Sequence, residues 1–317
     1  MMHFKTKFHL LLTVIILFIS QSACSGIKPE KLCQPNRLKI QMLGTRGPEL
    51  WDKQASVSYL VWLDNKARII IDAGPGSSQN FEASQAKFED LDAILFSHFH
   101  VDHSADFMAY AKGGFFTERT RDLMIIGPSA NQVFVSADQF VERAIGKKGV
   151  YSYLSNFVSE EQNSAFKIRP KTLPWTDDHP EVMTAYRNPA TGLVVKAVAT
   201  RHGPVPAFAY RVEAAGCSVV LSGDMSGQMG KVPAFARNAE ILVAHNAVPE
   251  DASGVALKLH MKPSYIGKMA ARANVKQLLL THLMRRTADK SKTLTIIRKF
   301  YNGKVVFPED MDIYFAE

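Results

Sequence analysis

Residues 97–103 of the chain, Ser-His-Phe-His-Val-Asp-His, hold a high density of metal-binding side chains. The ligand-type residues follow the spacing H-x-H-x-D-H, at His98, His100, Asp102 and His103. The apolar run 91–96 before them has the character of a short strand, and residues 104–107 favour the start of a helix. At such a junction side chains can converge on a metal ion, because the alternation of a β-strand no longer separates them. The cluster therefore predicts a metal site where a strand ends.

Three more ligand-type residues stand at the ends of apolar, strand-like runs. They are His202 after residues 193–198, Asp224 after residues 218–221, and His282 after residues 277–281. A single histidine after a strand is more often an ordinary hydrogen-bonded residue. Four strand ends with the same chemistry indicate one shared site. A two-metal centre needs about three protein ligands per metal, and an anionic group between the metals reduces their repulsion.

In this order, the H-x-H-x-D-H run followed by His202, Asp224 and His282 resembles the metallo-β-lactamase superfamily. Within it, the chain most resembles the branch of tRNase Z and of related secreted hydrolases of the arylsulfatase and phosphodiesterase type. Further matches are the glycine loop at 43–48, the acidic turn at 71–76, the strand and turn at 125–128, and the F-G-Y-R-like run at 207–211. The resemblance covers about residues 38–315. It implies an α/β fold, the αββα four-layer sandwich, as a single domain over residues 38–317.

The resemblance also implies roles for individual residues. One metal would be held by His98, His100 and His202, the second by Asp102, His103 and His282, with Asp224 bridging both. His260, 22 residues before His282, takes the place of a histidine that gives a proton to the leaving group, and Asp102 is expected to join it in catalysis. Two positions depart from the branch. Its H-E-A-T run is His245-Asn246-Ala247-Val248 here, without the carboxylate that would orient the neighbouring histidine, and Met261 replaces a small hydroxyl residue.

The ligand set favours hydrolysis over redox chemistry. An imidazole-rich site with one bridging carboxylate suits two Zn²⁺ ions, with Mn²⁺ or Fe²⁺ as alternatives. His100 stands where di-iron relatives carry a carboxylate, and most true β-lactamases lack the aspartate found here at Asp224. We expect a hydrolase in which a metal-bound hydroxide attacks a small anionic ester, either an arylsulfate or a phosphodiester.

Two other functions stay open. One is a tRNase Z-like endoribonuclease that processes the 3′ end of tRNA, and the other is a metal-binding protein without catalytic activity. The 22 residues from His202 to Asp224 leave no room for the tRNA-gripping arm of many bacterial tRNases Z. Nucleic acid is therefore not the expected partner, and a homodimer is among the open assembly states.

The N-terminus predicts export. Lys5 and Lys7 precede the apolar run Leu10–Ile19, and small residues follow at 20–26. This is the layout of a secretory signal peptide over residues 1–23, with a linker over 24–37. The run is too short to span a membrane stably, so no transmembrane segment is expected after processing. The predicted location is the periplasm or the medium, with a lipoprotein attached through Cys24 or an uncleaved anchor as alternatives.

Composition fits a globular enzyme that acts on an anion. The 317 residues are 46% apolar and 21% charged, which is enough for a substantial core. The net charge of +8 could steer an anionic substrate, and Arg285 and Arg286 could contact its phosphate or sulfate, unless they are merely solvated. Cys33 and Cys217 could pair in an oxidising compartment, or Cys217 could simply be a small buried residue.

Overall fold

The computed structural model describes residues 1–3, 32–176, 181–228 and 230–317. Residues 31–317 form one compact unit. Apart from its first three residues, the predicted signal peptide lies outside the described residues, and so does Cys24. Within the described ranges, no helix is both long and apolar enough to cross a membrane.

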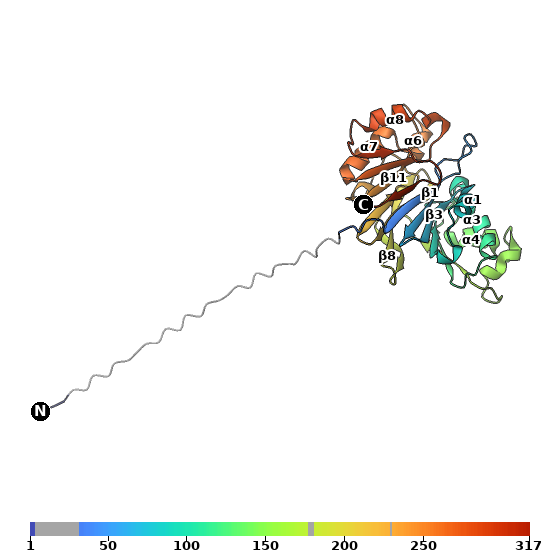
Figure 1. The fold of residues 1–317 in the computed structure, drawn as a ribbon, viewed down its shortest axis with the longest axis horizontal. Helices are drawn as coiled ribbons and strands as arrows, with labels where there is room; N and C mark the ends of the chain where they lie inside the picture. Colours follow the sequence, from blue (N-terminus) through green and yellow to red (C-terminus); the bar gives the residue numbers. More distant parts are fainter. Residues whose placement is uncertain (4–31, 177–180, 229) are drawn as a thin grey trace. The chain divides into compact units, whose positions relative to one another are not determined.

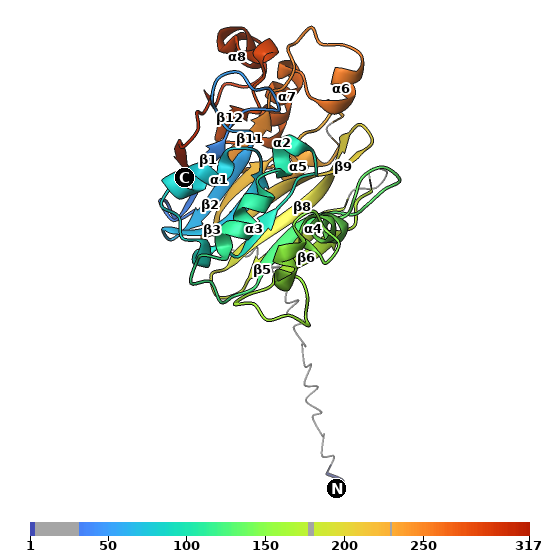
Figure 2. The same cartoon turned by 90° about the vertical axis from the view of Figure 1, so that its right-hand side faces the viewer.

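Two seven-stranded sheets form the centre of this unit (Figures 1 and 2). The first has the order β14-β1-β2-β3-β4-β5-β6, antiparallel from β14 to β3 and parallel from β3 to β6. Its strands are β1 Leu38–Gly44, β2 Ser58–Leu63, β3 Lys66–Ala73, β4 Ala93–Leu95, β5 Leu123–Pro128, β6 Ile168–Leu173 and β14 Ile313–Phe315.

The second sheet has the order β13-β12-β11-β10-β9-β8-β7. It is antiparallel from β7 to β10 and parallel from β10 to β13. Its strands are β7 Met183–Asn188, β8 Leu193–His202, β9 Val205–Ala214, β10 Cys217–Leu221, β11 Ile241–His245, β12 Gln277–Thr281 and β13 Lys304–Val306.

Helices cover the outer face of each sheet, as Figure 1 shows for α1, α3 and α4 beside the first sheet and α7 and α8 beside the second. The α-helices are α1 Ser77–Ala83, α2 Val101–Ser104, α3 Phe107–Gly114, α4 Ala137–Ile145, α5 Val232–Phe235, α6 Val255–Leu259, α7 Pro263–Ala273 and α8 Lys290–Ile297. Short 3₁₀ helices are η1 Phe88–Asp90, η2 Ser152–Phe157 and η3 Arg285–Thr287. The helix start expected near residue 107 is confirmed by α3, and Pro263 opens α7, where its missing N–H costs nothing.

Alternation along the strands explains the layering. In β3, Ile69 and Ile71 enter the apolar cluster between the sheets, whereas Ile70 packs under the first set of helices. In β10, Val219 belongs to the central cluster and Val220 to the one beneath α5 and α7. Successive side chains of a strand point to opposite faces, so a run that is apolar throughout must be covered on both sides. The three apolar layers confirm the predicted αββα sandwich.

The structure joins Cys33 and Cys217 in a disulfide. The bond ties the segment before β1 to the start of β10, and the backbone N–H of Gln34 donates to the Ala215 carbonyl beside it. Of the two readings that the sequence left open, the bridge is the one found.

Candidate metal centre

The predicted ligands meet beyond the ends of β4 in one sheet and of β8, β10 and β12 in the other. Since β10, β11 and β12 run parallel, their carboxyl ends share one edge of the sheet. Asp224 follows β10 through Gly223, which has a φ of +58°, and a Cβ there would lie 2.8 Å from the Phe208 carbonyl oxygen. Glycine is therefore the residue that fits this turn.

The first ligand group consists of His98, His100, His202 and Asp224, whose ligand atoms all lie within 4.8 Å of one another. His202 Nδ1 donates to the Leu259 carbonyl, so its Nε2 carries a free lone pair. This Nε2 lies 3.3 Å from His100 Nδ1 and 3.6 Å from Asp224 Oδ2. Several lone pairs directed at one point are what a cation requires.

The second group is formed around Asp102, His103 and His282. His282 Nε2 lies 3.1 Å from Asp102 Oδ2 and 3.4 Å from Asp224 Oδ2. His103 Nε2 lies 3.5 Å and 3.6 Å from the same two oxygens. Asp224 Oδ2 therefore faces both groups, as a bridging ligand must. The structure brings together all seven residues that the sequence predicted as ligands.

His245 also lies within 4.8 Å of His103, Asp224 and His282, and the sequence analysis did not include it among the ligands. Both of its ring nitrogens are already engaged. Nδ1 lies 2.7 Å from Asp224 Oδ1, and Nε2 lies 2.8 Å from the Tyr59 hydroxyl. Burial lowers its pKa, so the ring is neutral and keeps no lone pair for a metal. The signal was present, because His245 ends an apolar strand as the other ligand-type residues do.

Asp72 orients the segment 97–103 through hydrogen bonds with Ser97 and His103. Its Oδ1 accepts from the Ser97 backbone N–H at 2.6 Å, and its Oδ2 accepts from Ser97 Oγ at 2.8 Å and from His103 Nδ1 at 2.9 Å. Once the ring is neutral, its remaining proton stays on Nδ1 and His103 presents the Nε2 lone pair to the centre. A carboxylate behind a metal-binding histidine commonly sets its tautomer in this way.

The residues fit a pair of cations. His98 Nε2 and His103 Nε2 are buried, with no hydrogen-bond partner in the described part of the chain. Burial opposes the charged form of His282, but the carboxylates of Asp224 and Asp102 outweigh it and raise its pKa to about 9. Without metals, the two carboxylates thus recruit protons onto buried imidazoles. Divalent cations would supply the positive charge instead.

His260 lies beside the two groups without belonging to either. It caps α6, and its Nδ1 is 3.7 Å from Asp224 Oδ2, with the side chain 11% exposed. Burial lowers the pKa of His260 to about 3, and the Arg286 charge acts in the same direction. The His260 ring is therefore neutral at pH 7. Asn246, which replaces the carboxylate of the related branch, is buried with neither side-chain polar atom bonded to a described residue.

The two arginines beyond His282 have different surroundings. Arg285 is directed to the loop after β1, where its backbone N–H donates to Glu49 and its guanidinium to the Leu50 carbonyl. Arg286 donates from Nε to the Ala247 carbonyl and lies close enough to His260 to affect its pKa. Of the pair predicted to contact substrate, only Arg286 acts on the pKa of His260.

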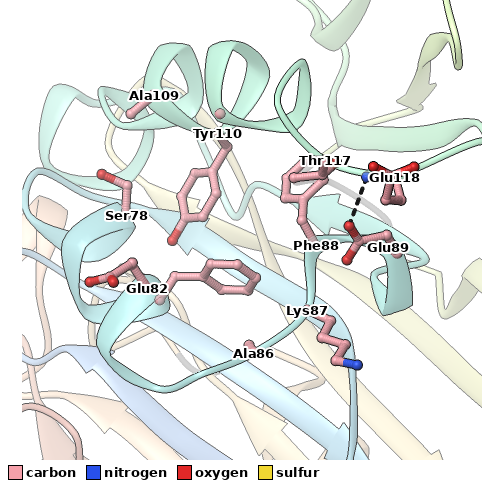
Figure 3. A pocket seen from close by; sticks show the side chains of 12 residues that line it. Ser78, Glu82, Ala86, Lys87, Phe88, Glu89, Ala109, Tyr110, Thr117 and Glu118 are labelled. Atoms are coloured by element: carbon pink, nitrogen blue, oxygen red, sulfur yellow. Dashed lines mark hydrogen bonds between the residues drawn. The ribbon is translucent and has the colours of Figure 1, made fainter.

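A separate hollow of about 740 Å³ lies between α1, η1 and α3 (Figure 3). The rings of Phe81, Phe88 and Tyr110 line it, and Glu89 accepts from the Glu118 backbone N–H at its wall. None of the seven predicted ligands lines this hollow. It is distinct from the metal centre.

Known proteins match this chain over most of its length. A family model described as a beta-lactamase superfamily domain matches residues 67–283. The probable metallo-hydrolase YhfI of Bacillus subtilis (strain 168) is 26% identical over 78% of this chain and 87% of its own length. The ribonuclease Z of Mycobacterium sp. (strain KMS) is 28% identical over 78% of this chain and 84% of its own length.

Solved structures have the same fold. The crystal structure of the B. subtilis YhfI has a TM-score of 0.65 at 22% identity, covering 89% of this chain and 100% of that one. The short form of human tRNase Z has a TM-score of 0.67 at 19% identity, covering 87% and 98%. Taken with the family model, these matches establish that the chain belongs to the beta-lactamase superfamily and has the metallo-β-lactamase fold.

Proposed function

We propose that the chain is an exported dinuclear metal hydrolase, with zinc as its metal, that cleaves a small anionic ester, either an arylsulfate or a phosphodiester. The observation that carries this proposal is the position of Asp224. One buried carboxylate oxygen faces both ligand groups, His260 Nδ1 lies 3.7 Å from it, and the charge of Arg286 is close enough to act on His260. An arrangement that only stored a metal would not need these two extra residues.

When bound, two divalent cations would activate water and polarise the ester. The protein residues supply the rest of the chemistry. Asp102 and Asp224 hold negative charge between the imidazoles. Asp72 keeps His103 in the tautomer whose Nε2 lone pair is directed at the centre. These residues keep the centre rigid, so little reorganisation is needed during the reaction.

His260 would serve the leaving group. Its Nδ1 faces the centre and is buried without a partner among the described residues. A proton on Nδ1 can therefore be offered to an ester oxygen lying next to the metals. The resting ring is neutral, so it must first take up a second proton, which the negative charge of a bound ester and of Asp224 favours; giving that proton to the leaving oxygen then returns the neutral imidazole.

Arg286 would hold the anionic part of the substrate. Its side chain is exposed, yet its Nε is fixed on the Ala247 carbonyl. A guanidinium pairs well with the paired oxygens of phosphate or sulfate. Arg285 has no such role in this proposal, because its guanidinium contacts the loop at Leu50.

A ribonuclease Z activity is the second candidate, and the similarity to the mycobacterial enzyme favours it. The segment between His202 and Asp224 consists of β9 and β10, joined by the short turn at Ala215 and Gly216. It holds no inserted arm for gripping tRNA. The exported ester hydrolase remains our first choice because of this compact hairpin and the predicted signal peptide.

Export is part of the proposal. The Cys33–Cys217 disulfide supports it, since such bonds persist in oxidising compartments such as the periplasm and are rare in the cytosol. Expressed in a bacterium, the protein should be recovered outside the cytoplasm and shortened by about 22–24 residues. Full-length protein with Met1 intact in the soluble cytoplasmic fraction would contradict export and favour the ribonuclease.

A substrate panel tests the reaction. Zinc-loaded mature protein is assayed with a chromogenic aryl sulfate, a bis-aryl phosphate, a lactone and a precursor tRNA, beside a His202→Ala variant as control. We expect hydrolysis of the sulfate or the phosphate, and its loss in the variant. Cleavage of precursor tRNA alone would establish the ribonuclease. A fully loaded protein that cleaves none of the four would indicate a metal-binding protein without catalytic activity.

A further inference from the structure

A line of buried hydrogen bonds leads from Asp224 to the opposite sheet. Asp224 Oδ1 lies 2.7 Å from His245 Nδ1, and His245 Nε2 lies 2.8 Å from the Tyr59 hydroxyl. That hydroxyl lies 2.7 Å from Thr281 Oγ1. All four side chains are at most 2% exposed. Tyr59 belongs to β2 of the first sheet, whereas His245 and Thr281 end β11 and β12 of the second.

Each hydrogen bond in this line has only one possible donor and one possible acceptor. The Asp224 carboxylate can only accept, so His245 Nδ1 must donate to it. A neutral imidazole then accepts at Nε2, which makes the Tyr59 hydroxyl the donor. The Thr281 hydroxyl in turn donates to the Tyr59 oxygen. Removing any member leaves a buried polar atom unpaired, so the line is held as a unit.

The line determines which oxygen of Asp224 is free. Oδ1 is occupied by His245, while Oδ2 lies 3.6 Å from His103 Nε2, 3.6 Å from His202 Nε2 and 3.4 Å from His282 Nε2. We propose that Tyr59 is a positioning residue for the metal centre: acting through His245, it fixes the Asp224 carboxylate so that Oδ2 stays directed at both ligand groups, which would hold the metals. This rests on the ligand set of the proposed function, but not on any ester being cleaved.

The Tyr59→Phe variant tests the proposal, because it keeps the ring in the core and removes only the hydroxyl. Its matched control is Tyr301→Phe. Tyr301 is 5% exposed and donates to the Val275 carbonyl, in the apolar cluster beneath α7 and α8. Tyr59→Phe loses two buried hydrogen bonds and Tyr301→Phe loses one, and only Tyr59→Phe touches the line to Asp224.

Metal binding is measured by competition with a chelator and by the visible spectrum of cobalt-substituted protein. We expect Tyr59→Phe to weaken the binding of at least one metal by about 10-fold to 100-fold, the usual range for a residue behind a ligand, and to shift the cobalt bands. Tyr301→Phe should do neither. Wild-type affinity and spectrum in Tyr59→Phe, or equal changes in the two variants, would overturn the proposal.

Two further variants keep the test decisive. If Tyr59→Phe does not fold, Thr281→Val removes the other end of the line, and should weaken binding in the same direction; unchanged binding would overturn the proposal. In a His245→Leu background, Tyr59→Phe should add less than a twofold further loss, because its effect passes through His245. Full additivity would contradict that route. A protein that binds two metals but cleaves no ester would refute the proposed function and leave this inference standing.

Discussion

The disulfide gives the most direct quantitative prediction. Cys33 and Cys217 are 184 residues apart, so the bond restricts most of the unfolded chain. The chain-entropy relation gives about 5 kcal/mol for a loop of this length, and measured losses for native disulfides run from about 2 to 5 kcal/mol. We therefore expect a Cys33→Ser, Cys217→Ala double variant to lose about 2–5 kcal/mol of unfolding free energy. Alanine is used at position 217 because that side chain packs in the apolar cluster between the sheets.

Denaturant unfolding with a chelator present measures this loss without a contribution from bound metal. The midpoint of thermal unfolding should fall by roughly 3–8 °C. Treating the wild-type protein with a reductant should reproduce most of the change. Metal content should be unaffected, because β10 remains paired with β9 and β11 on both sides. A loss below about 1 kcal/mol, or two free thiols in the oxidised, unfolded wild-type protein, would refute the reasoning.

Four other outcomes follow from the metal centre. Protein purified with zinc should hold close to two metals per chain, and Asp224→Ala should loosen both; metal analysis giving one or fewer after saturation would contradict the shared carboxylate. The His260→Ala variant should keep its metals. In steady-state assays its hydrolysis rate should fall little with a nitrophenolate leaving group, but about 100-fold or more with an alkoxide. Equal losses of rate on both substrates would show that His260 only positions the substrate. Arg286→Ala should raise KM for an anionic ester by about 10-fold while Arg285→Ala leaves it near wild type, and the reverse order would refute the assignment. In metal-free protein, His260 takes up a proton near pH 6.5 in the unfolded chain but only near pH 3 in the folded one. The free energy of unfolding therefore falls as the pH drops through this window. Between pH 7 and pH 5, denaturation should show the wild type losing about 2 kcal/mol more unfolding free energy than His260→Gln.

Local sequence was enough to predict that these ligand-type residues come together. His98, His100, Asp102 and His103 lie in one turn, and His202, Asp224 and His282 each follow an apolar run. Strand ends are where side chains can leave a sheet toward a common point, so the pattern of apolar runs already indicated that these residues meet. The layered α/β fold was predicted through the family resemblance, and strands that are apolar on both faces agree with it because they require cover on both.

Contacts between distant segments could not be read in this way. Tyr59 reaches His245 across 186 residues and Thr281 across 222, and nothing in the apolar strand 58–63 distinguishes a tyrosine that packs from one that also orients a ligand. Arg285 and Arg286 are neighbours in the sequence, yet the turn of η3 directs one guanidinium to a loop and places the other near His260. The pairing of Cys33 with Cys217 likewise depends on the docking of Cys33 and Gln34 against the start of β10. Side-chain direction and long-range proximity come from packing the two sheets together, and only the tertiary structure could decide them.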